Sequence, residues 1–327
     1  MRKFFDSNAL WLSMLIGALG YKIFLPLKPS LPWLIFFMLF FTFCKVNPKD
    51  LRLHKWHWVV LFLQIALSLA AYAITYLLTG SRFMAQGLML CFVMPTATAA
   101  PIIAGKMGGS IQNLTTFTLL SNFATAIIVP VLFPLVNPLA EKAFWPAFTL
   151  IISHISPLLL GPFFGAWLLR IVYQRWTKKE FVLSRTAAQI PFYLWVASIV
   201  VLSAVVTNTT ILNFQSQIAN ILILLVLSFF ACLLQFGLGK LIGYYLPAPS
   251  KGKDYQDVLI NPAAAPKTME GVSSITAGQA FGQKNTSLGV WMAQTYLHPL
   301  AALGAAAYII WQNLFNSIQL FVVAHKK

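Results

Sequence analysis

Long, uninterrupted apolar runs recur along the whole chain, and they are the feature that most limits its fold. A run of about 18 or more apolar residues can cross the hydrocarbon core of a membrane as a helix. The runs are continuously apolar rather than alternating, which argues against a β-barrel. With 59% hydrophobic and 9% charged residues, the chain has too little polar surface to cover a soluble globule. The sequence therefore predicts an all-α polytopic membrane protein with ten transmembrane segments: 8–26, 30–46, 56–79, 83–105, 110–136, 144–171, 188–207, 216–246, 270–296 and 298–322.

The polar connectors between these segments are short, so residues 1–327 are predicted to form a single membrane domain. Most lysines and arginines fall on the side that ten segments would give to both termini. The positive-inside rule then predicts a plasma or inner membrane protein with both termini in the cytoplasm. We attribute the net charge of +16 to loops that meet anionic lipid rather than to nucleic-acid binding.

Two glutamines in the middle of apolar segments indicate an internal repeat. Gln64 lies in "LFLQIALS" (61–68), and Gln235 lies in "CLLQFGLG" (232–239). An odd number of segments per copy makes the second copy enter the membrane in the opposite direction, which is the inverted-repeat plan of secondary transporters. The predicted five-helix repeats cover residues 8–136 and 144–322.

The fourth segment, "GLMLCFVMPTATAAPIIAGKMGG", is interrupted by proline. Pro95 and Pro101 each remove a backbone donor and clash with the preceding helical turn. Thr96 and Thr98 are polar residues that can bond the freed backbone groups. We therefore expect a break in this helix near Pro95.

The ninth segment, "MEGVSSITAGQAFGQKNTSLGVWMAQTYL", holds a polar run at the corresponding place of the second repeat. Gly278 and Gly282 weaken the helix, and the polar residues follow directly. Unwound backbone at membrane depth is tolerated only inside protein or beside a wet cavity. Breaks at corresponding positions of the two halves point to the binding site of a transporter. The polar run consists of Gln283, Lys284, Asn285, Thr286 and Ser287.

These stretches resemble the bile acid:sodium symporter family. The resemblance lies in "FFTFCKVNPKDLRLHKWHWVVLFLQIALS", "MPTATAAPIIAGKMGGSIQNLTTFTLLSNFATAIIVPVLFPLV" and "GQAFGQKNTSLGVWMAQTYLHPLAALGAAAYIIWQNLF". It implies ten helices in two inverted repeats, a core and a panel domain, and two broken helices, the fourth and ninth, that cross near the midplane. It also implies secondary transport of organic anions, sterol acids or smaller carboxylates, usually coupled to sodium.

The chain departs from the family at its sodium-site residues. Ala100 and Pro101 stand where the family has serine and asparagine, Ala280 stands at its glutamate, and Lys284 stands at its glutamine. In the fifth segment an ungapped alignment puts Leu114 at a serine ligand, whereas a one-residue gap puts Thr115 there. Thr118 and Gln64 are kept. Sodium prefers oxygen ligands that include a carboxylate. No aspartate or glutamate lies within an apolar core, so we expect no metal site: Asp6, Asp50, Glu141, Glu180, Asp254, Asp257 and Glu270 map to connectors or helix ends.

Lys284 is the residue that most needs an explanation. A buried ammonium is costly, so it either finds acceptors or releases its proton. We expect it to replace the sodium charge, with Gln64, Thr118 and Gln283 as its partners in ion coupling. A permanent charge predicts a uniporter or sodium-independent exchanger, and a titrating lysine predicts proton-linked transport. The expected substrate-binding residues are Thr96, Thr98, Asn285, Thr286 and Ser287, the last three because free N–H groups of a half-helix suit a carboxylate.

Other functions remain open at this point. One is a sodium-coupled symporter with a rearranged ion site, and another is a receptor or scaffold that kept the fold without transporting. We do not expect an enzyme or a cofactor, because the sequence has no nucleophile beside a base and no phosphate loop. His154 is expected to bond a neighbouring helix rather than to relay protons. Gln312, Asn313 and Asn316 are expected to form interhelical hydrogen bonds.

Overall fold

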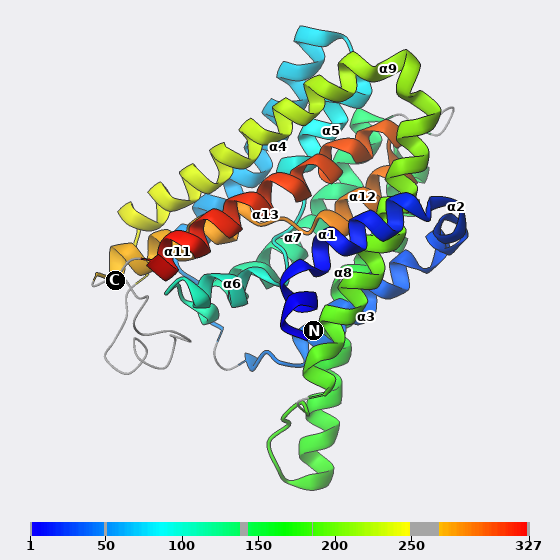
Figure 1. Ribbon diagram of the computed structural model, residues 1–327. Helices are drawn as coiled ribbons and strands as arrows, with labels where there is room; N and C mark the ends of the chain where they lie inside the picture. The colour runs from blue at the N-terminus through cyan, green and yellow to red at the C-terminus, as the bar shows by residue number, and fades with distance from the viewer. Residues whose placement is uncertain (1, 49–50, 138–142, 185, 249–267, 326–327) are drawn as a thin grey trace. The chain divides into compact units, whose positions relative to one another are not determined.

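The structure is a computed structural model that describes residues 2–48, 51–137, 143–184, 186–248 and 268–325 (Figure 1). Within these ranges the regular elements are helices and there is no strand, as the sequence predicts. In the described part of the chain, six helices are long and apolar enough to cross a membrane: Tyr21–Phe43, Lys55–Thr79, Ile111–Val136, Phe144–Thr177, Ala187–Tyr245 and Pro299–Val323. The helices therefore fit a membrane protein. The connector 247–267 is described only at its start, and Asp50, Glu141, Asp254 and Asp257 lie outside the described residues.

The first two predicted segments are divided more finely than expected. Helix α1 (Arg2–Leu19) is followed by the short α2 (Tyr21–Phe24), the 3-10 helix η1 (Leu25–Ser30) and α3 (Leu31–Phe43). Proline near the start of η1 and of α3 suits these positions, because the first N–H groups of a helix have no partner within it.

Three of the long helices have the predicted limits to within a few residues. Helix α4 (Lys55–Thr79) stops at Gly80, whose φ of 64° places it in the left-handed region. Helix α7 (Ile111–Val136) contains Pro130 and Pro134 without ending there. Helix α8 (Phe144–Thr177) extends six residues past its predicted end at residue 171.

Helix α9 (Ile190–Tyr245) corrects the loop that the sequence predicts between segments 188–207 and 216–246, because one helix of 56 residues runs through both. A helix of this length measures about 84 Å along its axis, more than one crossing of a core of about 30 Å requires, so two membrane-spanning segments here stay a prediction. The polar stretch that suggested a loop bonds back onto its own helix: the Thr209 hydroxyl donates to the Val205 carbonyl at 2.9 Å, and Asn213 Nδ2 donates to the Thr209 carbonyl at 2.8 Å. These side chains occupy the helix without breaking it.

Both predicted interruptions are present. The fourth segment divides into α5 (Arg82–Val93) and α6 (Ala100–Lys106), and the ninth divides into α11 (Met269–Gly282) and α12 (Thr286–Tyr296). The chain ends with η5 (Pro299–Ala301) and α13 (Ala302–His325). We call residues 94–99 the first break and residues 283–285 the second break.

The chain divides into two compact units that do not follow the sequence order. Unit 1 contains residues 1–47, 126–219 and 290–302, and unit 2 contains residues 48–125, 220–289 and 303–327. Both breaks lie entirely within unit 2. Helices α7, α9, α12 and α13 each contribute residues to both units.

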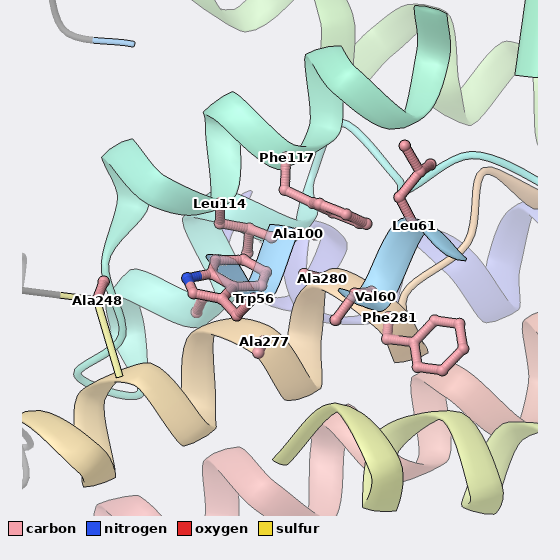
Figure 2. Close-up of a cluster of buried hydrophobic side chains, with 11 residues drawn as sticks. Trp56, Val60, Leu61, Ala100, Leu114, Phe117, Ala248, Ala277, Ala280 and Phe281 are labelled. Atoms are coloured by element: carbon pink, nitrogen blue, oxygen red, sulfur yellow. The ribbon is translucent and has the colours of Figure 1, made fainter. Parts of the chain in front are cut away.

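A hydrophobic core of unit 2 includes residues of α11, the half-helix that ends just before the second break. Trp56 is fully buried between helix α7, which carries Leu114 and Phe117, and helix α11, which carries Ala277 (Figure 2). The Trp56 and Phe117 rings lie 5.6 Å apart. Helix α9 approaches α11 closely at a glycine, since a Cβ on Gly239 would come within 2.5 Å of the Ala277 carbonyl oxygen. Small residues thus let these helices pack backbone to backbone.

Candidate functional site

The two breaks pair with each other inside unit 2. Thr96 and Lys284 form an isolated antiparallel bridge. The Ala97 N–H donates to the Gln283 carbonyl at 3.0 Å, and the Asn285 N–H donates to the Pro95 carbonyl at 2.8 Å. Each break thereby satisfies backbone groups that the other left open, which is a requirement for non-helical backbone in an apolar interior. The bridge joins segments that are almost 190 residues apart in the sequence.

The carbonyls that end α5 are satisfied by side chains from several elements. Gln235 Nε2 donates to the Cys91 carbonyl at 3.1 Å. Gln64 Nε2 donates to the carbonyls of Val93 at 3.2 Å and Met94 at 3.3 Å. The two glutamines singled out in the sequence therefore both bind the end of the same half-helix, which answers the need for partners at a buried helix C-terminus.

Lys284 supplies the remaining donor at this helix end. Its side chain is 1% exposed, and its Nζ donates to the Phe92 carbonyl at 3.0 Å. The same Nζ lies 5.1 Å from the centroid of the Phe281 ring. The C-terminus of a helix carries partial negative charge, so the end of α5 is a favourable place for a cation. The lysine is thus buried where the two breaks pair.

The backbone of Lys284 is held by a second side chain, from α13. Gln312 Oε1 accepts from the Lys284 N–H at 2.9 Å, and Gln312 Nε2 donates to the Lys284 carbonyl at 3.3 Å. The Gln312 amide thus bonds the N–H and carbonyl of Lys284 as the backbone of a neighbouring strand would. The first break pairs with the opposite side of the second break. The prediction that Gln312 makes an interhelical bond is confirmed. Asn313 instead bonds the Ile309 carbonyl of its own helix.

Thr96 is tied to both halves of the site. Its hydroxyl donates to the Ala280 carbonyl of α11 at 2.7 Å, and its N–H donates to Ser121 Oγ at 3.2 Å. The Ser121 hydroxyl in turn donates to Gln64 Oε1 at 3.2 Å. These bonds make a continuous buried network from α4 through α7 to the first break.

The second break continues into α12 through a capped N-terminus. Asn285 Oδ1 accepts from the Leu288 N–H at 3.2 Å, which is the geometry of a helix N-cap. Within the described residues, Asn285 Nδ2 has no hydrogen-bond partner although the side chain is 5% exposed. Thr286 and Ser287 are buried in the following turn. The start of α12 therefore has free donor capacity suited to an anionic group.

Three other predicted site residues have different surroundings. Thr98 is half-buried in the turn before α6. The Thr118 hydroxyl donates to the Leu114 carbonyl of its own helix at 2.9 Å. Gln283 Nε2 donates to Gln279 Oε1 at 2.6 Å, while its carbonyl belongs to the bridge. Of these, Gln283 directly adjoins Lys284.

Sequence reasoning missed three contributors to the site. The Tyr308 hydroxyl donates to the Gly282 carbonyl at 2.8 Å at the end of α11 and accepts from Gln235 Nε2 at 3.1 Å. Ser121 links Gln64 to Thr96, and the Thr125 hydroxyl donates to the Val93 carbonyl at 3.4 Å. Polar residues spaced by four on one helix, as Ser121 and Thr125 are, were the available signal.

His154 lies in unit 1, on α8. Its Nδ1 lies 3.1 Å from the Tyr296 hydroxyl, and the two rings are stacked with centroids 6.4 Å apart. Asn137 Nδ2 also reaches this region, where it donates to the Tyr296 carbonyl at 2.9 Å. The expectation that His154 bonds a neighbouring helix is confirmed.

No family model matches the sequence, and no curated protein matches it either. The interpretation of the site therefore depends on its own geometry. In chemical terms it is a pair of interrupted helices that share a bridge, a buried ammonium at one helix C-terminus, and unused donors at one helix N-terminus.

Proposed function

We propose that this chain is a secondary transporter of organic anions, sterol acids or smaller carboxylates, that works by alternating access without sodium. On this proposal it is a divergent member of the bile acid:sodium symporter family. It then has ten transmembrane helices in two inverted repeats, a core and a panel domain, and both cytoplasmic termini in a plasma or inner membrane. The bridged breaks of unit 2 support this plan, because paired half-helices are the usual substrate site of such transporters.

The observation that carries the proposal is the contact between Lys284 Nζ and the Phe92 carbonyl. The ammonium lies at the helix end where a carbonyl oxygen would otherwise be available to a metal ion. The neighbouring carbonyls of Val93 and Met94 already accept from Gln64. A site whose oxygens are engaged by fixed donors, one of them charged, has little left to offer sodium, which needs several free oxygen ligands.

The substrate side of the proposal uses the start of α12. An anionic carboxylate would accept from Asn285 Nδ2, which has no hydrogen-bond partner among the described residues, beside Thr286, Ser287 and the half-buried Thr98 at the N-terminus of α12. The positive charge of Lys284, one residue earlier, favours an anion there. Coupling is then either absent, if the lysine stays charged throughout, or proton-linked, if the lysine exchanges its proton during the cycle.

The first test is the thermal stability of the detergent-purified protein in sodium, potassium or choline chloride at matched ionic strength, across pH. Ligands that bind only the folded state raise its stability by mass action. We expect no effect specific to sodium. Proton coupling predicts that part of the pH dependence of the wild type is lost in Lys284→Gln, whereas a fixed charge predicts the same pH dependence in both. Stabilisation of the wild type by sodium alone would refute the role given to Lys284.

The second test is flux. Proteoliposomes are loaded with radiolabelled cholate, as a sterol acid, or radiolabelled pyruvate, as a small carboxylate. Sodium-independent exchange of either compound supports the proposal, and Lys284→Met should reduce it. Saturable binding without flux would instead identify a receptor of the same fold.

A further inference from the structure

Helix α8 is longer than a membrane requires. Its 34 residues span about 51 Å at the usual rise, whereas a hydrocarbon core is about 30 Å thick. From Phe144 onwards its first charged residue is Arg170, which follows more than six turns of uncharged helix. The part of α8 after Arg170, together with the segment that returns toward α9, therefore extends past the hydrocarbon. We call residues 171–184 the α8 arm; it is drawn in green in Figure 1.

The base of the α8 arm is fixed to unit 1 by defined contacts. Arg170 Nη2 donates to the carbonyls of Cys44 at 3.2 Å and Val46 at 2.8 Å, just after α3. The guanidinium lies 5.6 Å from the Phe181 ring, and Tyr173 meets the same ring edge-on with centroids 5.4 Å apart. The two sides of the arm are thus held together by one aromatic ring.

The return segment has its own attachment. Lys45 Nζ donates to the Ala188 carbonyl at 2.7 Å, four residues past the end of the arm. This contact joins the end of α3 to the 3-10 helix η3 (Ala187–Gln189). The arm is therefore anchored at both ends, so the side chains it exposes have a reproducible arrangement.

The exposed side chains of the arm combine apolar and cationic character. Trp176 is 85% exposed and Val182 is 80% exposed. Arg175 is exposed just before Trp176, Lys178 and Lys179 are exposed between Trp176 and Val182, and Glu180 is the acidic residue of the arm. Large exposed apolar groups beside clustered cations are typical of a surface that lies in the headgroup region of a bilayer, where aromatic rings enter the interface and cations meet anionic lipid.

We propose that the α8 arm is a binding site for anionic phospholipid headgroups on the side of the membrane where α8 ends. Arg175 and Lys179 contact the phosphates, and Trp176 enters the interface beside them. The charge of the arm argues for lipid, because three exposed cations against one acid complement an anionic surface. The inference depends on the chain spanning a membrane and is independent of any transport activity.

The test compares Arg175→Gln/Lys179→Gln with the charge-matched control Lys55→Gln/Lys106→Gln, whose lysines are exposed in unit 2. Binding of phosphatidylglycerol and phosphatidylcholine to the purified protein is titrated by native mass spectrometry. Each cation near an anionic surface contributes enough for the arm variant to lose roughly 30-fold in phosphatidylglycerol affinity. The control variant should bind phosphatidylglycerol at the arm as the wild type does.

A reporter on the arm gives a second readout. Val182→Cys, labelled with an environment-sensitive fluorophore, is placed in nanodiscs of either lipid. We expect a blue shift in phosphatidylglycerol relative to phosphatidylcholine that is reduced by high salt and by the double arm variant. Equal affinity for the two lipids, or equal loss in both double variants, would overturn the proposal. A shift that depends on protein concentration rather than on lipid would also overturn it, in favour of contact between copies of the chain.

Discussion

The first and second breaks meet at one bridge, yet their backbone is satisfied in different ways. Proline has no N–H, so Pro95 in the first break leaves carbonyls at the end of α5 in need of other donors. Side-chain donors from Gln64, Gln235 and Lys284 supply them. The second break has no proline, so its N–H groups also need partners. The bidentate amide of Gln312 meets that need because it both accepts and donates.

This difference teaches that a helix can be interrupted in an apolar interior by two routes. One removes donors from the chain and leaves acceptors for side chains to satisfy. The other keeps all backbone groups and places an amide beside them. The second route depends on a single side chain, so the second break should be the more sensitive of the two to substitution.

The largest expected effect is from Gln312→Leu. It leaves the buried N–H of Lys284 without a partner, so the free energy of unfolding should fall by about 3 kcal/mol. Denaturant unfolding of the purified protein in detergent measures it. Asn313→Leu is the matched control, because Asn313 bonds the Ile309 carbonyl of its own helix. Equal losses in both variants would show that the bidentate contact has no special importance.

A smaller effect is expected when the glutamines that bind the end of α5 are compared with each other. Gln64→Leu should cost about 2 kcal/mol, since the Met94 carbonyl and the Ser121 hydroxyl both lose their partner. Gln235→Leu should cost about 1 kcal/mol, since Oε1 of Gln235 is buried without a partner among the described residues and disappears with the substitution. The same unfolding assay ranks the pair, and the reverse order would contradict this view of the first break.

Steric room is limited at Gly282, the last residue of α11 before the second break. A Cβ on Gly282 would overlap the Phe236 ring, so Gly282→Ala should destabilise by about 1 to 2 kcal/mol. Gly237→Ala is the control, because a Cβ there meets nothing within 4 Å. The midpoint of thermal unfolding compares the two. If Gly282→Ala is restored by Phe236→Leu, the overlap is the cause of the loss.

The smallest expected effect is the contribution of His54 to the pH dependence of stability, which has to be distinguished from any contribution of Lys284. His54, which precedes α4, has a pKa lowered by burial, against a hydrogen bond with Asn113 that raises it. The unfolded state binds the His54 proton more tightly than the folded state does. The free energy of unfolding should therefore be unaffected by His54 above pH 6.5 and should fall as the pH drops below that value. Melting curves of wild type and His54→Asn across this window measure the contribution. Any pH dependence that remains in His54→Asn and is lost in His54→Asn/Lys284→Gln then belongs to Lys284.

The sequence was informative about the breaks because proline, glycine and polar residues are rare in apolar segments. It predicted both interruptions and the burial of Lys284, but it assigned Gln64 to Lys284, whereas Gln64 bonds the Val93 and Met94 carbonyls. It could not predict the bridge, since Pro95 and Asn285 carry no signal of mutual pairing. It also gave no sign that Tyr308 reaches the Gly282 carbonyl, because a tyrosine in an apolar helix is ordinary.

The continuity of α9 was missed for a related reason. Thr209 and Asn213 have the composition of a loop, but their side chains bond carbonyls one turn earlier and remain compatible with a helix. The helix limits of α4 and α7, by contrast, followed from simple apolar length. Polar composition alone thus distinguishes poorly between a loop and a helix whose side chains bond to its own backbone.

Lys284 contributes to the site twice: its backbone takes part in the bridge between the two breaks, and its ammonium binds the end of α5. The backbone bridge would form with any side chain at residue 284 that fits the space. Lysine and glutamine codons differ by a single base. One point mutation could therefore remove the positive charge from the paired breaks, or restore it, while the backbone bridge between them is kept. The charge of this site can therefore change over evolution much faster than its backbone structure.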